Sequence, residues 1–356
     1  MGSPVTIIAE IGINFNGDFD TCLALIDAAA AAGCDVAKFQ VFSADTLYPR
    51  SAGVLAWKDE NGAFTYDIFT AVKKNELPRE WVAPLMAHCE RRGIGFLASV
   101  FSADDARFLV KAGATALKIS SSSVRNLPLV DACAAFGVPL IVSTGGSRLG
   151  EVEDVVDTVC RHHDRLTLLH CSLQYPTPPE DCHLGAIGTL AAAFPRVAVG
   201  YSDHTAHATA APVQAVTLGA RVIEKHITLD RRMPGPDHFF ALEPDELAAM
   251  VAGVRSAEAG LAAGEVEAVD PVLFGSSAKR VEEGERYLRD FVANQIFVRR
   301  AIAKGDIITT EDLLVLRRGE KGAGLAPKYL SLFAGYTVRA ARDIEAEAPM
   351  DWGCIL

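Results

Sequence analysis

The chain has 356 residues, of which 50% are hydrophobic, with a formal net charge of −11 and a pI near 5.3. This length and apolar content predict a globular protein with one large domain and something smaller. The acidic balance argues against nucleic acid as a partner. The apolar residues occur in short blocks, so no run approaches the roughly 18 residues that a membrane span requires, and we expect no membrane contact.

The eight cysteines are scattered along the chain without a C-x-x-C pair. This spacing favours free, buried thiols in a reducing compartment over a disulfide framework. The first residues have no basic region ahead of their apolar block, unlike a secretion signal. We therefore expect a cytoplasmic protein.

Apolar blocks of strand length alternate with helical patterns through most of the chain. The eight blocks are residues 5–12, 36–42, 94–101, 116–122, 139–146, 166–172, 197–204 and 222–228. Eight strand–helix pairs predict the α/β class and a (β/α)8 TIM barrel, which we place at residues 1–275. An open doubly wound sheet is the alternative. We expect a linker at 276–296 and a small β-rich domain at 297–356, where short β-prone runs alternate with turn signals.

The stretch AKFQVF, residues 37–42, has Lys38 and Gln40 between apolar neighbours. In a barrel strand the alternate side chains face the packed interior, which places both residues inward near the mouth. The same alternation brings further polar side chains to that mouth: Glu10, Ser99, Lys118, Ser121, Ser143, Tyr175, His204 and His226. Two inward lysines with nearby hydroxyls suit an anion such as phosphate or carboxylate. The alternative is that the lysines extend to solvent at the strand ends.

His204 and His226 end adjacent predicted strands, which suits two imidazoles that share one divalent metal. Glu224 and Asp203 are nearby carboxylates that could support such ligands. The alternative is that both histidines are structural hydrogen-bonding residues. No G-x-S-x-G sequence is present, so a serine-hydrolase triad is not expected.

The ordered set AEIGIN, KFQ, LKIS, NLPLV, VSTGGS, LLHC, YPTP, GYSDHT, IEKHIT and GPDH resembles the sialic acid (N-acetylneuraminate) synthase family. The tail sequence RRAIAKGDIITTEDLLVLRRG resembles the antifreeze-like (SAF) domain that follows the barrel in that family. The resemblance covers nearly the whole chain. It implies a transferase of carbohydrate biosynthesis that condenses phosphoenolpyruvate with an N-acylated amino sugar aldose and releases phosphate.

The resemblance also implies roles for individual residues. Phosphoenolpyruvate is assigned to Lys38, Ser99, Lys118, Ser121 and Ser143, and a manganese or magnesium ion to His204 and His226. The acceptor sugar is assigned to Glu10, Gln40, Tyr175, Asp237 and Arg317. Glu10 is also the carboxylate we favour for proton transfer, although a structural hydrogen bond would serve equally. In this family Arg317 corresponds to an arginine from a partner subunit, which implies a domain-swapped homodimer.

The chain departs from the family pattern at Phe15, Val100, Ser122, Ser123, Leu173, Arg318 and Phe239–Phe240. These changes remove polar groups and add rings, so the acceptor could be a legionaminate- or pseudaminate-type sugar or another aldose. Two other functions stay open: a metal-dependent aldolase or lyase on the same barrel, which would release no phosphate, and a catalytically silent carbohydrate-binding relative.

Overall fold

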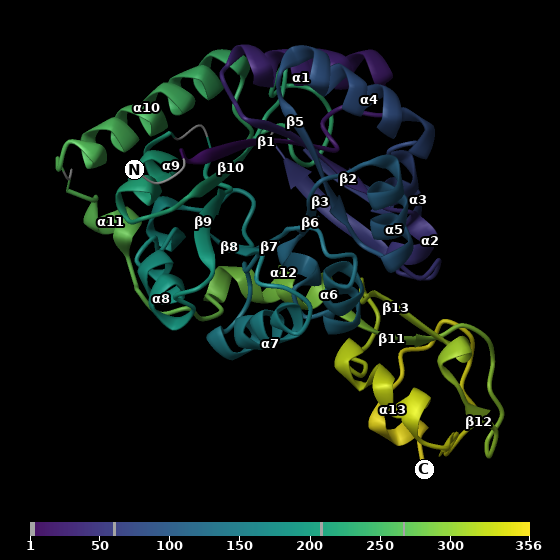
Figure 1. Cartoon of the computed structure of the whole chain (residues 1–356). Helices are drawn as coiled ribbons and strands as arrows, with labels where there is room; N and C mark the ends of the chain where they lie inside the picture. Colours follow the sequence, from purple (N-terminus) through teal and green to yellow (C-terminus); the bar gives the residue numbers. More distant parts are fainter. Residues whose placement is uncertain (1–3, 60–61, 207–208, 266–267) are drawn as a thin grey trace.

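The barrel predicted from the sequence is present in the computed structural model, which describes residues 4–59, 62–206, 209–265 and 268–356. Eight parallel strands close on themselves in the order β1-β10-β9-β8-β7-β6-β5-β2, inside a ring of helices (Figure 1). The barrel strands are β1 (Thr6–Gly12), β2 (Val36–Val41), β5 (Gly95–Val100), β6 (Leu117–Ile119), β7 (Leu140–Ser143), β8 (Leu166–Cys171), β9 (Ala198–Asp203) and β10 (Val222–His226). Each of them falls within one of the predicted blocks.

The surrounding helices begin and end at signals that the sequence carries. Asp18 and Ser102 accept hydrogen bonds from backbone N–H groups as N-caps of α1 and α5, and Gly93 and Gly113 end α4 and α5 in the left-handed conformation. The helices are α1 (Phe19–Ala31), α4 (Arg79–Arg92), α5 (Ala103–Ala112), α6 (Leu127–Ala134), α7 (Leu149–Cys160), α8 (Ala186–Ala193), α9 (Ala210–Thr217) and α10 (Pro244–Ala262).

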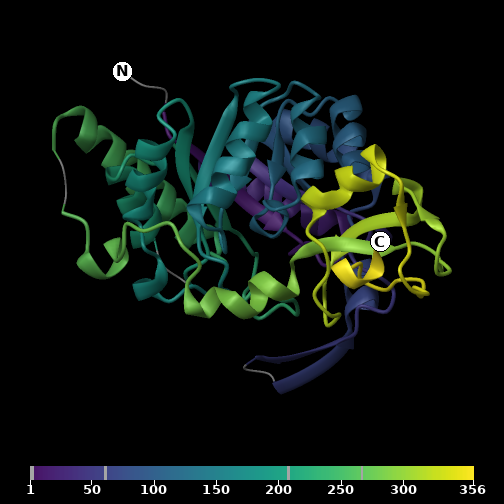
Figure 2. The ribbon, with the colours of Figure 1, turned by 90° about the horizontal axis from the view of Figure 1, so that it is seen from below.

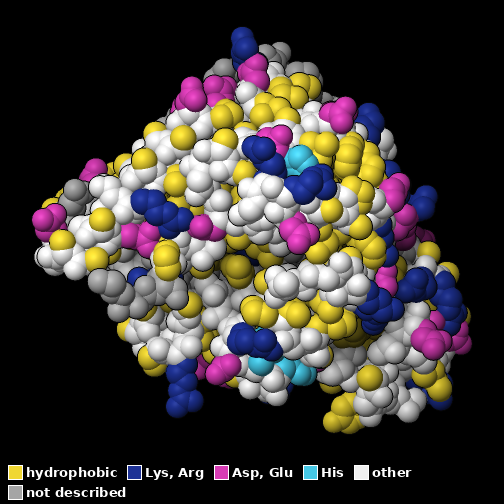
Figure 3. Space-filling model, turned by 45° about the horizontal axis from the view of Figure 1, so that its top comes forward, with side chains coloured by type: hydrophobic (Ala, Val, Ile, Leu, Met, Phe, Trp, Pro, Cys, Tyr) yellow, Lys and Arg dark blue, Asp and Glu magenta, His cyan; other side chains and the backbone are white. Residues whose placement is uncertain are grey.

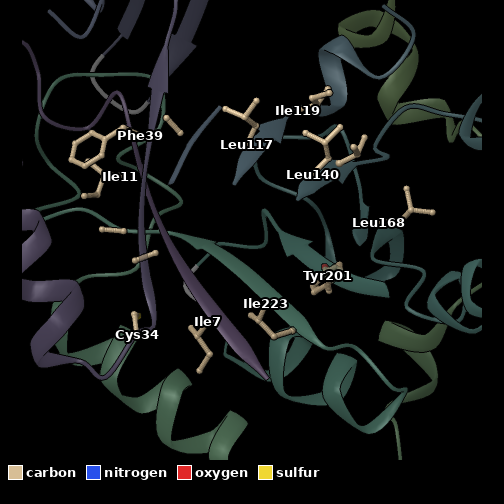
Figure 4. Packing of buried hydrophobic residues seen from close by; sticks show 14 of the residues in the cluster. Ile7, Ile11, Cys34, Phe39, Leu117, Ile119, Leu140, Leu168, Tyr201 and Ile223 are labelled. Carbon is tan, nitrogen blue, oxygen red and sulfur yellow. The ribbon is translucent and has the colours of Figure 1, made fainter. Parts of the chain in front are cut away.

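Alternation along the strands divides the apolar residues into two layers. Outward side chains such as Ile7, Phe39 and Tyr201 pack against the helices in the main core (Figure 4). Inward residues form a separate cluster that closes the floor of the barrel: Ile8, Leu97, Leu169 and Val222. The next inward positions toward the strand ends are polar, and these positions form the mouth.

One addition to the barrel was not predicted. After β2 the chain forms α2 (Ala44–Leu47), the antiparallel hairpin β3 (Val54–Asp59) and β4 (Gly62–Asp67), and α3 (Ile68–Lys74). The charged stretch after α10 is partly helical, as its sequence predicts, and contains α11 (Pro271–Phe274) and α12 (Arg286–Phe291). The hairpin and α12 lie on the same side of the barrel (Figure 2).

The tail has its own core and its own small sheets. Strands β11 (Asn294–Val298) and β13 (Leu313–Arg317) pair antiparallel, as do β12 (Ile307–Ile308) and β14 (Val338–Arg339), with α13 (Leu330–Gly335) beside them. Ile296, Leu313, Phe333 and Met350 belong to a cluster separate from the barrel core. Short 3-10 segments occupy Ser121–Ser123, Pro179–Asp181, Glu283–Glu285, Thr310–Asp312, Pro327–Tyr329 and Trp352–Cys354.

Three expectations about composition can be compared with the structure. All eight cysteines are free, and every one except Cys160 is buried. Within the described ranges, none of the helices combines the length and apolar character needed to cross a bilayer. On the face drawn in Figure 3, basic and acidic side chains are interspersed rather than gathered by sign.

Candidate active site

The twelve residues expected at the site all line one cavity of about 310 Å³ at the barrel mouth. They are Glu10, Lys38, Gln40, Ser99, Lys118, Ser121, Ser143, Tyr175, His204, His226, Asp237 and Arg317. Strand alternation predicted ten of these positions, and their place in the cavity agrees with it, whereas Asp237 and Arg317 were expected from the family resemblance alone. The roles of the twelve residues are not decided by position. Glu224, which we expected on the same face as His226, also lines the cavity, and lining residues without a predicted place include Cys171, Leu288 and Val292.

Four buried charges form the floor of this cavity. Lys38 Nζ lies 2.6 Å from Glu10 Oε2 and 3.5 Å from Glu224 Oε1. Lys118 Nζ donates to Ser143 Oγ at 2.6 Å and lies 3.8 Å from Glu224 Oε2. Glu224 therefore bridges the two lysines, and both lysines are almost fully buried rather than extended to solvent.

Sequence reasoning identified Lys38 as a buried cation in need of an anion, but not these partners. The alternation does place Glu10 and Glu224 inward, and that signal could have found them. Each lysine also contacts an expected serine: Lys38 Nζ donates to Ser99 Oγ at 3.2 Å, and Lys118 to Ser143. Within the chain, Lys38 is therefore paired with two carboxylates, those of Glu10 and Glu224.

The pKa values in this cluster follow from burial and pairing. Burial alone would lower the pKa of Lys38, but Glu10 and Glu224 raise it, so the ammonium stays charged. Burial would raise the pKa of Glu224, but Lys118 and Lys38 together lower it. For Lys118 burial prevails and its pKa is lowered, and for Glu10 burial raises the pKa against the opposing effect of Lys38.

The two histidines face each other across the mouth, with ring centroids 5.4 Å apart. His204 Nδ1 lies 2.8 Å from the Ser172 carbonyl oxygen, which assigns the proton to Nδ1 and leaves Nε2 with a lone pair. Burial, followed by the charges of His204 and the lysines, holds the pKa of His226 well below its usual value. Burial would lower the pKa of His204, but Cys171 and the Ser172 carbonyl raise it. His226 is therefore the neutral ring, and His204 can offer Nε2 as a ligand once it has lost its second proton.

This pair fits a divalent metal by the chemistry of its donors. His226 Nδ1 is buried and has no hydrogen-bond partner among the described residues, and it lies 3.8 Å from Asp237 Oδ2. Burial raises the pKa of Asp237 to about 6. No set of three or more histidine, cysteine or acidic side chains suited to a metal occurs in the described parts of the chain, so two imidazoles with open positions are what the residues offer.

Aromatic rings hold the histidines in place. Tyr175 lies against His204 with ring centroids 4.1 Å apart, and Phe240 packs on His226 at 4.9 Å. Phe240 is fully buried behind the two imidazoles and Phe239 packs on it, so this departure from the family pattern supports the histidines rather than lining the cavity.

We expected Asp203 to support the histidine pair, but its carboxylate faces away from the two rings. It lies on the outward face of β9, where its carboxylate is 2.5 Å from Lys225 Nζ and accepts from the Thr205 hydroxyl at 2.8 Å. Successive strand residues point to opposite faces, so the neighbour of an inward His204 must face the helices. The buried Asp203–Lys225 ion pair and its contacts with Thr205 fix the chain on both sides of His204.

The departures from the family pattern fall into two groups. Phe15 and Val100, the last residue of β5, pack in the main core between the barrel strands and the helices. Neither lines the cavity, contrary to our expectation for Phe15. Ser122 lines the cavity and accepts a hydrogen bond from Arg317 Nη2 at 2.6 Å. Leu173 also lines it and packs against Phe291 of α12. Ser123 is buried, and Arg318 Nε donates to the Lys321 carbonyl at 2.6 Å.

Glu285 attaches α12 to the rim of the mouth. Its Oε1 accepts from the backbone N–H groups of Gly146 at 2.7 Å and Leu173 at 2.8 Å, and the residue is 2% exposed. Leu288 and Val292, which follow it, line the cavity. No sequence signal identified this contact, because a helix of six residues shows too little periodicity.

Arg317, at the end of β13, reaches the mouth of the barrel of its own chain. Its guanidinium carbon lies 5.0 Å from the Phe101 ring centroid and 5.7 Å from that of Tyr48. Nε is buried and finds no acceptor among the described residues. A single chain thus brings the tail arginine to the cavity, where we expected the arginine of a partner.

A closed barrel with two buried lysines and paired histidines at its mouth, followed by a small β domain, is the arrangement that the resemblance to the sialic acid synthases implies. The chain belongs to the NeuB family, whose sequence pattern matches residues 25–266, and the SAF domain pattern matches residues 294–356. It is an enzyme of the sialic acid and nonulosonic acid synthase type.

Named relatives agree with this assignment. The chain is 41% identical over 355 residues to the spore coat polysaccharide biosynthesis protein SpsE of Bacillus subtilis, covering 99% of this chain and 94% of SpsE. The crystal structure of SpsE superposes with a TM-score of 0.88 over 100% of this chain and 96% of that one. The N,N'-diacetyllegionaminic acid synthase of Legionella pneumophila is 36% identical, over 99% of this chain and 95% of its own.

Replacing Glu285 with Ala should loosen α12 from the rim. Two buried N–H groups lose their acceptor, so we expect a loss of about 2 kcal/mol in stability and faster hydrogen exchange at the amides of Gly146 and Leu173. Glu283→Ala is the matched control, because its side chain is 83% exposed. Equal exchange at both amides in the two variants would contradict the anchoring role.

Proposed function

We propose that the enzyme condenses phosphoenolpyruvate with an N-acylated amino sugar aldose to give a nonulosonic, 2-keto-3-deoxy acid and phosphate. The observation that carries this proposal is the pair of buried lysines beside serine hydroxyls, opposite the two imidazoles of His204 and His226, in one cavity. Such a floor suits the carboxylate and phosphate of phosphoenolpyruvate, and the imidazole side suits the aldehyde of the acceptor.

The lysines and serines hold the anion in this proposal. Lys38 and Lys118 supply the positive charge, while Ser99 and Ser143 already contact them and can turn toward an anionic oxygen. Ser121 Oγ accepts from the Gly145 N–H at 2.9 Å, so its own proton is available for a further acceptor. The cavity excludes much of the solvent, which strengthens each of these contacts.

The proposed reaction balances without an oxidant. The enol carbon of phosphoenolpyruvate bonds to the aldehyde carbon, and the aldehyde oxygen takes up a proton. Water adds to carbon 2 and loses a proton, and the carbon–oxygen bond to phosphate breaks. Glu10, whose pKa is raised by burial, would enter the reaction protonated, give this proton to the aldehyde oxygen, and then, as a carboxylate, take the proton from the attacking water. Glu10 Oε1 accepts a hydrogen bond from Gln40 Nε2 at 2.9 Å, and this bond fixes the orientation of the carboxylate.

His204 and His226 would hold a manganese or magnesium ion. The chemistry that such an ion supplies when bound is polarisation of the aldehyde oxygen. Gln40, Tyr175, Asp237 and Arg317 surround the remaining space and would contact the acceptor. The names of the relatives include legionaminic, pseudaminic and N-acetylneuraminic acid synthesis, and we infer an acceptor of this general kind.

The proposal is tested by phosphate release. Purified enzyme is supplied with phosphoenolpyruvate, a divalent metal and a panel of N-acylated amino aldoses, and phosphate is measured together with the 2-keto acid. We expect both products to appear in equal amounts and only when an acceptor is present. Formation of a keto acid without phosphate would instead favour the aldolase or lyase function.

Lys38→Met and Lys118→Met should each weaken phosphoenolpyruvate binding. The ligand charge is then left without its partner, which costs about 2–4 kcal/mol, or roughly 30- to 1,000-fold in affinity. Lys111→Met, an exposed lysine on α5, is the matched control. Isothermal titration that finds wild-type affinity in both variants would rule out this anion site.

Chelation should abolish activity, and manganese or magnesium should restore it. His204→Ala and His226→Ala should each remove metal binding, measured by calorimetry, without a change in the circular dichroism spectrum. His162→Ala, an exposed histidine, serves as the control. Full turnover in the presence of a strong chelator would show that the pair has only a structural role.

We further propose a domain-swapped homodimer. Only Val292 and Ala293 separate α12 from β11, so α12 and the tail would exchange as one unit. An exchange of identical units preserves every contact of the closed chain, so the contacts that Arg317 makes here are compatible with a swap.

Mixing Arg317→Ala with His204→Ala chains tests the swap. In a swapped heterodimer one of the two mouths holds both intact residues, so part of the activity should return after subunits exchange. Light scattering establishes the dimer, and a tagged chain establishes the exchange. Confirmed exchange without recovered activity would mean that Arg317 serves the barrel of its own chain.

A further inference from the structure

A second cavity adjoins the mouth and differs from it in chemistry. Its volume is about 220 Å³, far more than the roughly 10–15 Å³ that one buried water needs. It shares five lining residues with the mouth: Ile13, Gln40, Phe101, Pro236 and Arg317. We refer to it below as the side chamber.

The wall of the side chamber is mostly apolar. Its remaining lining residues are Phe42, Leu47, Tyr48, Tyr66, Ile68, Ala71, Val72, Asn75 and Phe291. Phe42, Leu47, Tyr48, Ile68, Phe101 and Phe291 belong to one buried cluster. Asn75, the amide in this wall, donates from Nδ2 to the Ala71 carbonyl at 2.9 Å, so its N–H is directed at the backbone.

Polar groups lie at the junction of the two cavities. Gln40 Nε2 is bonded to Glu10, and Arg317 Nη2 to Ser122, so both side chains are held at the border. Arg317 Nε is buried without an acceptor among the described residues, and it is a donor suited to a carbonyl oxygen. A ligand that extends from the mouth therefore meets a polar border first and an apolar wall beyond it.

We infer that the side chamber binds an alkyl or acyl substituent at the far end of the acceptor aldose. This inference rests on the proposed function and narrows its substrate class. Beyond the border, Tyr48, Tyr66 and Asn75 are the lining residues with polar side-chain groups, and the other lining residues there are apolar. A free hydroxyl against that apolar part of the wall would lose its water without gaining a partner, whereas a methyl group would gain from burial. The enzyme thus selects an aldose with a deoxy or acylated terminus over one with a terminal hydroxymethyl group.

The test compares two N-acetylated amino aldoses that are identical except for a terminal methyl or hydroxymethyl group. We expect wild-type kcat/KM to favour the methyl compound by about tenfold or more, because a buried hydroxyl without partners is costly. Ala71→Leu, which fills the chamber, should raise KM for the methyl compound about tenfold and leave KM for phosphoenolpyruvate unchanged. Thr70→Leu introduces a leucine at the neighbouring, exposed position of α3 and should change neither constant.

A second variant keeps the test decisive if Ala71→Leu does not fold. Val72→Ser places a hydroxyl in the chamber wall. It should reduce the kcat/KM preference for the methyl compound, because turnover of the hydroxymethyl compound improves. Equal kcat/KM for the two aldoses in wild type, with phosphate released from both, overturns this inference and leaves the proposed function intact. Absence of phosphate release with every acceptor overturns the proposed function and this inference with it.

Discussion

The mouth of the barrel depends on four charges that cannot be buried singly. Lys38, Lys118, Glu10 and Glu224 sit where an isolated ion would cost several kcal/mol, and their mutual contacts offset that cost. They come from β2, β6, β1 and β10, and β6 lies opposite β10 in the closed sheet. Glu224 thus connects strands across the interior, so the cluster forms only when the barrel is closed.

The cluster is balanced in charge before any ligand arrives, which constrains how an anion can bind. Lys38 already has two carboxylate neighbours, so an anion must displace one, arrive with a cation, or follow protonation of a carboxylate. Glu10 is the member whose pKa burial raises, whereas Glu224 is held ionised by both lysines. Glu10, the carboxylate nearest to Lys38, is therefore the one that most easily becomes neutral. Once Glu10 is protonated, the positive charge of Lys38 is no longer fully balanced, so an anionic substrate can bind.

Strand alternation predicted the barrel and the inward side chains, because period and capping are local properties of the sequence. It did not identify the partners of Lys38 or the anchoring by Glu285. The outward direction of Asp203 does follow from alternation once His204 faces inward, but we expected Asp203 beside the histidines because the two residues are adjacent in the sequence. Contacts such as Glu285 with Gly146 join residues more than a hundred positions apart, and local patterns carry no information about them. Phe15 shows the converse error: a departure from a family motif suggested an acceptor contact, whereas the ring packs on Phe39 and Trp81.

Apart from the five residues at their border, the two cavities are built from different parts of the chain, and this separates the chemistry from the selection of the acceptor. Barrel strands supply the charges and histidines, so a change there disturbs the closed sheet and the buried ion pairs together. The side chamber is formed largely by the segment between β2 and α4, together with Phe291 of α12, and these parts contribute no member of the charge cluster. Substitutions in those segments can reshape the apolar wall while the floor remains intact. Acceptor preference can therefore differ between relatives that share one reaction, as the different products in their names indicate.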